Sequence, residues 1–129
     1  MLRRNSAIKM HSELYFKRIR EKLRYGNKQN YMGMHYDSIL EANYAEELDY
    51  LLENKKIYGW QRQKKIEIRL RGYFICNYYI DFVVTQLDGS LQYVEVKGLK
   101  SELFMIKWRI LETFKDEILG SDSELIIIR

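Results

Sequence analysis

The chain has 129 residues, of which 47% are hydrophobic and 31% charged, a balance that predicts one globular domain with a substantial core rather than a disordered segment. A single cysteine excludes an intramolecular disulfide, and no apolar run approaches the roughly 20 residues of a membrane-spanning helix. The charged N-terminus is unlike a signal peptide, so we expect a cytoplasmic protein that does not contact a membrane.

The first expected element is a basic helix over residues 6–25, followed by Gly26 at the position of a helix-terminating glycine. Residues 1–30 hold nine Lys or Arg and two Glu, a net charge of +7, whereas the other 99 residues have a net charge of −3. A basic arm on a nearly neutral body favours an anionic partner, most simply nucleic acid, although a solvated helix face has the same composition. The arm residues expected to contact DNA are Lys17, Arg18, Arg20, Lys22 and Arg24.

A second helix is expected from Asp37-Ser38 to about Asn54, and its apolar stripe is Leu40, Tyr44, Leu48, Leu51 and Leu52. The apolar period then changes from 3.6 to 2, which predicts a half-buried strand over residues 65–70. Residues 74–85 form a second strand, almost wholly apolar in its later part and therefore central in a sheet.

A third strand is expected over residues 91–97, then a third helix capped by Ser101, and a short last strand in "ELIIIR". The apolar side of that helix is expected to be Leu103, Ile106, Ile110, Leu111 and Phe114. The order is α-β-β-β-α-β after one extra helix, which predicts a mixed central sheet flanked by helices, with the last strand parallel to its neighbour. Among aromatic residues, Tyr73, Phe74, Tyr78 and Tyr79 are candidates for stacking on bases, but core packing is their expected role.

Charged residues stand in the most apolar hairpin, "YIDFVVTQLDGSLQYVEVKG", which contains Asp81, Glu95 and Lys97. A two-residue loop would set residue 81 opposite residue 96, whereas the three-residue loop Leu87-Asp88-Gly89 sets it opposite residue 95. The longer loop requires a left-handed third residue, and Gly89 supplies it. It also gathers four apolar side chains on one core face: Ile80, Phe82, Val94 and Val96. We therefore expect the three charged groups to converge.

Two adjacent buried carboxylates repel each other and would cost several kcal/mol of stability without compensation. A divalent cation with oxygen ligands compensates them, and Mg²⁺ suits such a site because it keeps some waters and also binds substrate phosphate. Lys97 would then orient a water or stabilise the charge of a phosphoryl transition state. The alternative is a structural salt bridge between Lys97 and either Asp81 or Glu95. On the third helix, Lys100, Lys107 and Arg109 are candidates to hold phosphates, and a solvated helix face explains them almost as well.

A fourth acidic residue, Glu41, is expected in the first turn of the second helix, at the edge of its core-facing stripe. Its alternative role is structural, because Ser38 and Glu41 have the S-x-x-E spacing of a capping box, which stabilises a helix by about 1 kcal/mol.

Five segments in order resemble the small phage-encoded endonucleases of the PD-(D/E)xK superfamily, which are Holliday-junction-resolvase-like. They are "YDSILEA" (36–42), Gln63, "YYIDF" (78–82), "VEVKG" (94–98) and "KSE" (100–102). The resemblance covers about residues 31–129 and implies the αβββαβ nuclease core there, with residues 1–30 as a separate arm. Ile80 precedes Asp81 where the superfamily name has proline, which removes no metal ligand.

The resemblance implies that Asp81, Glu95 and Glu41 hold the metal and that Lys97 is the catalytic lysine. Gln63 matches a recurrent glutamine near the site. It further implies a Mg²⁺-dependent DNA endonuclease, with Mn²⁺ able to replace Mg²⁺, that hydrolyses phosphodiester bonds of branched or Holliday-junction DNA in phage recombination or DNA processing, in the host cytoplasm. Two alternatives remain open: a non-catalytic nucleic-acid-binding protein on the same fold, and a transposase-associated or restriction-like enzyme cutting duplex DNA. By analogy with resolvases, which cut two strands symmetrically, a homodimer is expected.

Overall fold

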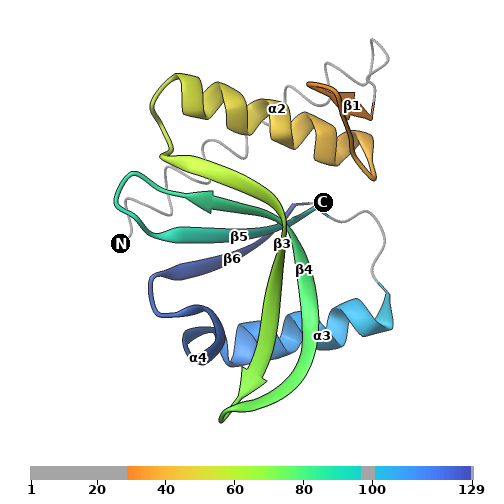
Figure 1. The fold of residues 1–129 in the computed structure, drawn as a ribbon, viewed down its shortest axis with the longest axis vertical. Helices are drawn as coiled ribbons and strands as arrows, with labels where there is room; N and C mark the ends of the chain where they lie inside the picture. The colour runs from red at the N-terminus through yellow and green to blue at the C-terminus, as the bar shows by residue number, and fades with distance from the viewer. Residues whose placement is uncertain (1–28, 97–100, 129) are drawn as a thin grey trace. The chain divides into compact units, whose positions relative to one another are not determined.

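The computed structural model describes residues 29–96 and 101–128 (Figure 1). The elements in chain order are β1 (Asn30–Tyr31), β2 (Met34–His35), α2 (Ile39–Glu53), β3 (Gly59–Leu70), β4 (Tyr73–Thr85), β5 (Leu91–Val96), α3 (Glu102–Thr113), α4 (Lys115–Leu119) and β6 (Ser123–Ile128). The helix expected over residues 6–25 lies outside the described ranges, and the division expected at residue 30 stays a prediction. In the part of the chain that is described, no helix combines the length and apolar character needed to cross a membrane.

Contacts divide the chain into two units, residues 1–50 and residues 51–129, each of which is described by itself. In the first unit, β1 and β2 form a small antiparallel hairpin that the sequence patterns do not predict. The Tyr31 hydroxyl of this hairpin donates a hydrogen bond of 2.6 Å to the Asp49 carboxylate on α2. The helix confirms the predicted bounds, beginning directly after Ser38 and ending at Glu53, but its predicted apolar stripe was wrong at Leu52, which is 40% exposed.

The second unit is built on a four-stranded mixed sheet of order β3-β4-β5-β6. The strands β3, β4 and β5 are antiparallel, and β6 runs parallel to β5. This confirms the predicted strand order and the parallel crossover through α3. However, β3 begins at Gly59, six residues before the alternating pattern, and Figure 1 shows it curving together with β4 as a long ribbon. The turn between them has two left-handed residues, Arg71 and Gly72, which suits a tight hairpin.

The helix α3 packs one side on the core of this unit, but not the side that was expected. Its buried residues are Phe104, Trp108 and Leu111, at the i, i+4, i+7 spacing, and they join a cluster with Ile66, Ile68, Tyr78, Ile80, Val83 and Tyr93. The predicted stripe was wrong at three residues, Leu103, Ile106 and Phe114, which are 61%, 53% and 42% exposed. The helix carries apolar residues on both sides, and the two large aromatic rings bury more apolar area than the smaller side chains would. The predicted cap is confirmed, because the Ser101 hydroxyl accepts the Phe104 N–H at 3.1 Å.

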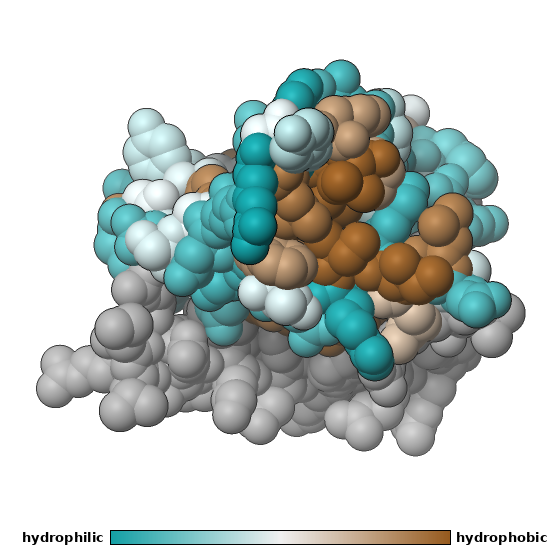
Figure 2. All heavy atoms as spheres, turned by 90° about the horizontal axis from the view of Figure 1, so that it is seen from below, coloured by the Kyte–Doolittle hydropathy of each residue, from teal (hydrophilic) through white to brown (hydrophobic). Residues whose placement is uncertain are grey.

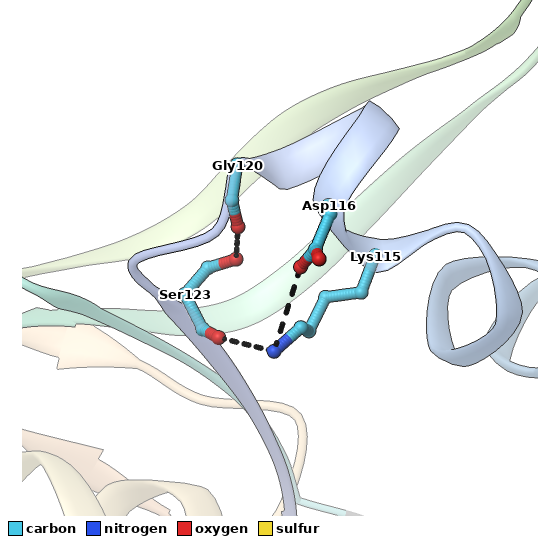
Figure 3. Close-up of polar contacts among 4 residues, drawn as sticks. All are labelled: Lys115, Asp116, Gly120 and Ser123. Carbon is cyan, nitrogen blue, oxygen red and sulfur yellow. Dashed lines mark hydrogen bonds and ion pairs between the residues drawn. The ribbon is translucent and has the colours of Figure 1, made fainter. Parts of the chain in front are cut away.

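The connection from α4 to β6 is fixed by polar contacts that Figure 3 shows. The Lys115 ammonium donates to the Ser123 carbonyl at 2.8 Å, and the Ser123 hydroxyl donates to the Gly120 carbonyl. Gly120 has a φ of 95°, which glycine adopts without strain. These contacts start β6 at Ser123, opposite Leu91 of β5, and so set its register along the sheet.

Core packing was expected for the aromatic residues in the first half of β4, and the structure corrects this expectation. Tyr78 is buried as expected, but Tyr73, Phe74 and Tyr79 are 77%, 50% and 56% exposed. Core packing therefore explains one of the four residues. The reason is the alternation of the strand, because Tyr78 points into the α3 cluster and its neighbour Tyr79 points away from it.

Candidate functional site

The β4–β5 hairpin has the register that brings Asp81 and Glu95 together. The ladder pairs Phe82 with Val94 and Thr85 with Leu91, which sets residue 81 opposite residue 95. The Gln86 N–H donates to the Ser90 carbonyl at 2.8 Å, enclosing a three-residue loop whose last residue, Gly89, has a φ of 87°. Both features confirm the register predicted from the sequence. Ile80, Phe82, Val94 and Val96 are all buried as expected, but of these four only Ile80 belongs to the α3 cluster, so the burial does not establish the single apolar face that was expected.

The Asp81 carboxylate lies where the two strands separate. The ladder ends at Phe82 and Val94, although β5 continues to Val96. Past that point, the Val96 N–H donates to Asp81 Oδ2 at 2.8 Å, so the side chain replaces a carbonyl of the neighbouring strand as the acceptor. Asp81 is 7% exposed and is therefore held in one orientation by the backbone of β5.

Gln63 of β3 supplies the second donor to this carboxylate. Its Nε2 donates to Asp81 Oδ1 at 3.2 Å. Gln63 lies between the paired residues Arg62 and Lys64 and has a φ of 50°, a left-handed conformation that costs a non-glycine residue about 1–2 kcal/mol. Strain of this kind persists where the surroundings impose it, and it is frequent at functional sites. The expected proximity of Gln63 to the site is therefore observed as a direct contact.

Glu95 is the more deeply buried carboxylate, with 2% of its surface exposed. The Tyr78 ring lies beside it, packed against Phe104 with ring centroids 6.3 Å apart. Burial first, then the Glu95 carboxylate and the charge of Asp81, raise the pKa of the Tyr78 hydroxyl well above its usual value of about 10. The hydroxyl oxygen is buried, and none of the described residues meets it at regular hydrogen-bond geometry. Sequence reasoning gave Tyr78 only a core role, because nothing in its spacing shows that its hydroxyl reaches the carboxylates.

The donor set at this place fits a hard divalent cation. Asp81 and Glu95 offer carboxylate oxygens, and two N–H donors fix the orientation of the Asp81 carboxylate. The buried Tyr78 hydroxyl adds a polar atom with bonding capacity for a water. Across residues 29–96 and 101–128, no three His, Cys, Asp or Glu side chains are arranged together to hold a metal. Mg²⁺ is commonly held by one or two carboxylates with waters and substrate phosphate, so two carboxylates suffice.

The other predicted site residues are only partly described. Glu41 belongs to the first unit, where it is 6% exposed and its N–H donates to the Ser38 hydroxyl at 3.0 Å, which confirms the cap half of the predicted capping box. Lys97, Lys100 and all five basic arm residues lie outside the described ranges. On α3, Arg109 is exposed, whereas the Lys107 ammonium donates to the Asn77 carbonyl at 3.1 Å and so is tied to β4.

The comparisons with known proteins give one match. Residues 20–121 match the family described as "Protein of unknown function (DUF1064)", and the chain belongs to that family. No curated protein and no solved structure matches the chain.

Proposed function

We propose that this member of the DUF1064 family is a metal-dependent DNA endonuclease whose Asp81 and Glu95 hold Mg²⁺. The observation that supports the proposal most directly is the buried pair of carboxylates at the point where β4 and β5 separate. Two buried carboxylates at one place cost stability unless a cation compensates them. We propose Mg²⁺ as that cation, and a structural salt bridge to Lys97 is the alternative compensation.

The residues of the site have separate tasks in this proposal. The Val96 N–H and the Gln63 amide hold the Asp81 carboxylate in a fixed orientation, so it is preorganised before metal and substrate arrive. Packing of Tyr78 beside Glu95 keeps bulk water from that carboxylate. When bound, Mg²⁺ supplies Lewis-acid polarisation of the phosphodiester and a water of lowered pKa. Lys97, one residue beyond β5, and Glu41 remain proposed as the catalytic lysine and the third carboxylate.

Cleavage of a four-way junction, a duplex and a single strand, each with Mg²⁺ and with excess chelator, tests the proposal. We expect metal-dependent cleavage that Asp81→Asn and Glu95→Gln abolish. Two exposed acidic residues provide matched controls, since Asp122→Asn and Glu112→Gln remove the same charges elsewhere on the second unit. Cleavage that persists in chelator, or that the two control variants lose equally, contradicts the proposal. Preference for the junction would identify a resolvase-like enzyme, and equal cleavage of duplex a restriction-like one.

A non-catalytic DNA-binding protein is the second candidate, and one observation favours it. Five basic residues lie within residues 62–71 of β3 and its turn, namely Arg62, Lys64, Lys65, Arg69 and Arg71, with Glu67 as the single acidic residue among them. Such a strand attracts phosphate whether or not the carboxylates are catalytic. Salt-dependent DNA binding without cleavage of any of the three substrates would establish this candidate instead.

A further inference from the structure

The β3–β4 ribbon has one buried and one exposed face along its outer half. Ile66, Ile68 and Tyr78 pack into the core beneath α3, whereas Lys65 and Tyr79 are exposed. Lys65 and Tyr79 are direct partners in the antiparallel ladder, so a cation and an aromatic ring stand next to each other on the exposed face. Farther out, the Arg69 guanidinium lies 5.5 Å from the centroid of the Phe74 ring, which repeats the same combination.

Protection of the sheet edge from pairing with other chains explains part of the residue composition of this exposed face. β3 is at the edge of the described sheet, and charged residues on an edge strand prevent pairing with other chains. This explanation covers the lysines but not the rings, because an exposed tyrosine or phenylalanine beside them adds apolar area that edge protection would avoid. Alternating cations and aromatic rings are the combination with which proteins bind unpaired nucleic acid, since the cations contact phosphates and the rings stack on bases.

Lys65 and Tyr79 lie close to the candidate site at Asp81. Gln63 and Asp81 are in contact, and Lys65 and Tyr79 are each two residues farther along the same strands, about 7 Å away at the rise of a β-strand. Gln63 is itself exposed, so an exposed residue of the ribbon contacts the Asp81 carboxylate directly.

We infer that the exposed face of the β3–β4 ribbon binds an unpaired DNA strand, with a base stacked on Tyr79 and a phosphate at Lys65. The inference rests on the proposed function, and it narrows the substrate to DNA with an unpaired stretch beside the scissile bond. A second copy of this chain is the competing occupant, because Figure 2 shows apolar side chains gathered on the face seen from below, where Figure 1 places α3 and the β3–β4 turn. The exposed apolar residues of those elements include Phe74, Ile75, Leu103 and Ile106. The row of cations on β3 is complementary to a phosphate backbone and repels a second row of the same sign, which favours DNA.

Binding of the full chain to an oligothymidine strand and to a blunt duplex of the same length, measured by fluorescence anisotropy in chelator, tests the inference. We expect Tyr79→Ala to weaken binding of the single strand about fivefold or more while changing duplex binding less than about twofold. Tyr79→Phe keeps the ring and should bind like the wild type. The matched control is Tyr58→Ala, which removes another tyrosine, 76% exposed, from the opposite end of the ribbon. Lys65→Gln should reduce the salt dependence of single-strand binding by about 0.7 in log–log slope.

Equal single-strand binding by Tyr79→Ala, Tyr58→Ala and the wild type overturns the inference. A change of sedimentation in Tyr79→Ala without a change in single-strand binding also overturns it and assigns the face to self-association. Because these binding measurements need no turnover, their outcome is independent of the outcome of the cleavage assay. If the wild type cleaves none of the substrates but Tyr79→Ala weakens single-strand binding, the nuclease proposal alone is refuted. If the wild type cleaves DNA but Tyr79→Ala binds the single strand as well as the wild type does, this inference alone is refuted.

Discussion

Asp81 Oδ2 accepts the backbone N–H of Val96 at 2.8 Å, so one acidic side chain bridges the gap that opens between β4 and β5. This bond fixes the orientation of the Asp81 carboxylate, which would otherwise have several rotamers, and so prepares it for the proposed metal binding. It also gives Asp81 a structural task in addition to its proposed chemical one. Variants of Asp81 must therefore separate the two.

Asp81→Asn and Asp81→Ala are expected to differ in stability but not in activity. Asparagine keeps an oxygen for the Val96 N–H, whereas alanine leaves that buried donor unpaired at a cost of about 1–3 kcal/mol. Both variants lose a negatively charged ligand and should lose cleavage. Urea unfolding monitored beside the cleavage assay checks this, and an Asn variant that cleaves at the wild-type rate would show that the charge of Asp81 has no catalytic role.

Gln63→Gly is expected to lower cleavage with little net change in stability. Glycine relieves the left-handed backbone at φ 50°, which favours the fold, but the variant loses the bond from the Gln63 amide to Asp81. The two effects should cancel to within about 1 kcal/mol. Lys55→Gly is the matched control, since Lys55 has a φ of 56°. Relief of about 1–2 kcal/mol of left-handed strain exceeds the entropic cost of glycine, about 0.5–1 kcal/mol, so stability should rise by up to about 1 kcal/mol with cleavage unchanged. Equal cleavage in both variants would limit Gln63 to a backbone role.

Alkaline unfolding should depend on Tyr78. Its pKa is raised by burial and then by Glu95, so the folded state keeps the phenol proton to higher pH than the unfolded state does. This contribution is fully present below the unfolded pKa of about 10 and is lost as pH rises above it, at up to about 1.4 kcal/mol per pH unit. Burial raises the pKa of Tyr93 as well, which adds to the loss. In Tyr78→Phe the free energy of unfolding should fall less steeply above about pH 10. Urea titrations on both sides of that pH check it, and identical slopes in variant and wild type would contradict it.

The variant Glu41→Gln should show whether Glu41 acts as a metal ligand or only as part of the helix cap. The Glu41 N–H donates the cap bond to the Ser38 hydroxyl, and this bond does not involve the Glu41 carboxylate. We therefore expect the variant to stay within about 1 kcal/mol of the wild-type free energy of unfolding while cleavage falls at least about tenfold. Ser38→Ala provides the opposite case, with about 1 kcal/mol of stability lost and cleavage kept. Wild-type turnover in Glu41→Gln would leave Glu41 with the structural role alone.

The sequence predicts the hairpin well because two independent constraints agree there. Gly89 is suited to the left-handed loop position, and the alternation of residues around Asp81 and Glu95 favours the register that sets these two residues opposite each other. The same reasoning fails at α3, where both sides are apolar and only the volumes of Phe104 and Trp108 decide between them. Propensities also give no sign of the left-handed Gln63, since a glutamine in a strand carries no local signal for that conformation. Its contact with Asp81 depends on tertiary structure, and only the resemblance pointed to it.

Exposure of the β4 aromatic residues is a related case. Tyr78 and Tyr79 are chemically identical neighbours, so the sequence can establish that one faces inward but not which one. The bulge between Ile68 and Arg69 shifts the register by one residue at the outer end of the ribbon and changes which side chains face outward there. Core packing was predicted for Tyr73, Phe74, Tyr78 and Tyr79. Three of them are exposed instead, because the strand pairing and its bulge decide which side chains face outward.

The last prediction concerns the basic arm, whose charge is known although it lies outside the described ranges. Residues 1–30 have a net charge of +7, whereas the remaining 99 residues have a net charge of −3. If the five predicted contacts are made, deleting residues 1–25 should reduce the log–log salt slope of duplex binding by several units, at about 0.9 for each phosphate. Cleavage should remain metal-dependent, because no proposed ligand is removed.

The apolar residues of the same segment suggest a competing role in dimerisation, and the same truncation distinguishes the two. Loss of a dimer in sedimentation with an unchanged salt slope would assign the arm to the subunit interface, whereas a shallower slope at constant mass would assign it to DNA. Both changes together fit a helix that uses one side for each task. If the truncated chain keeps its oligomeric state and its salt slope, the arm has neither role, and the contrast of charge between arm and body reflects only a solvated surface.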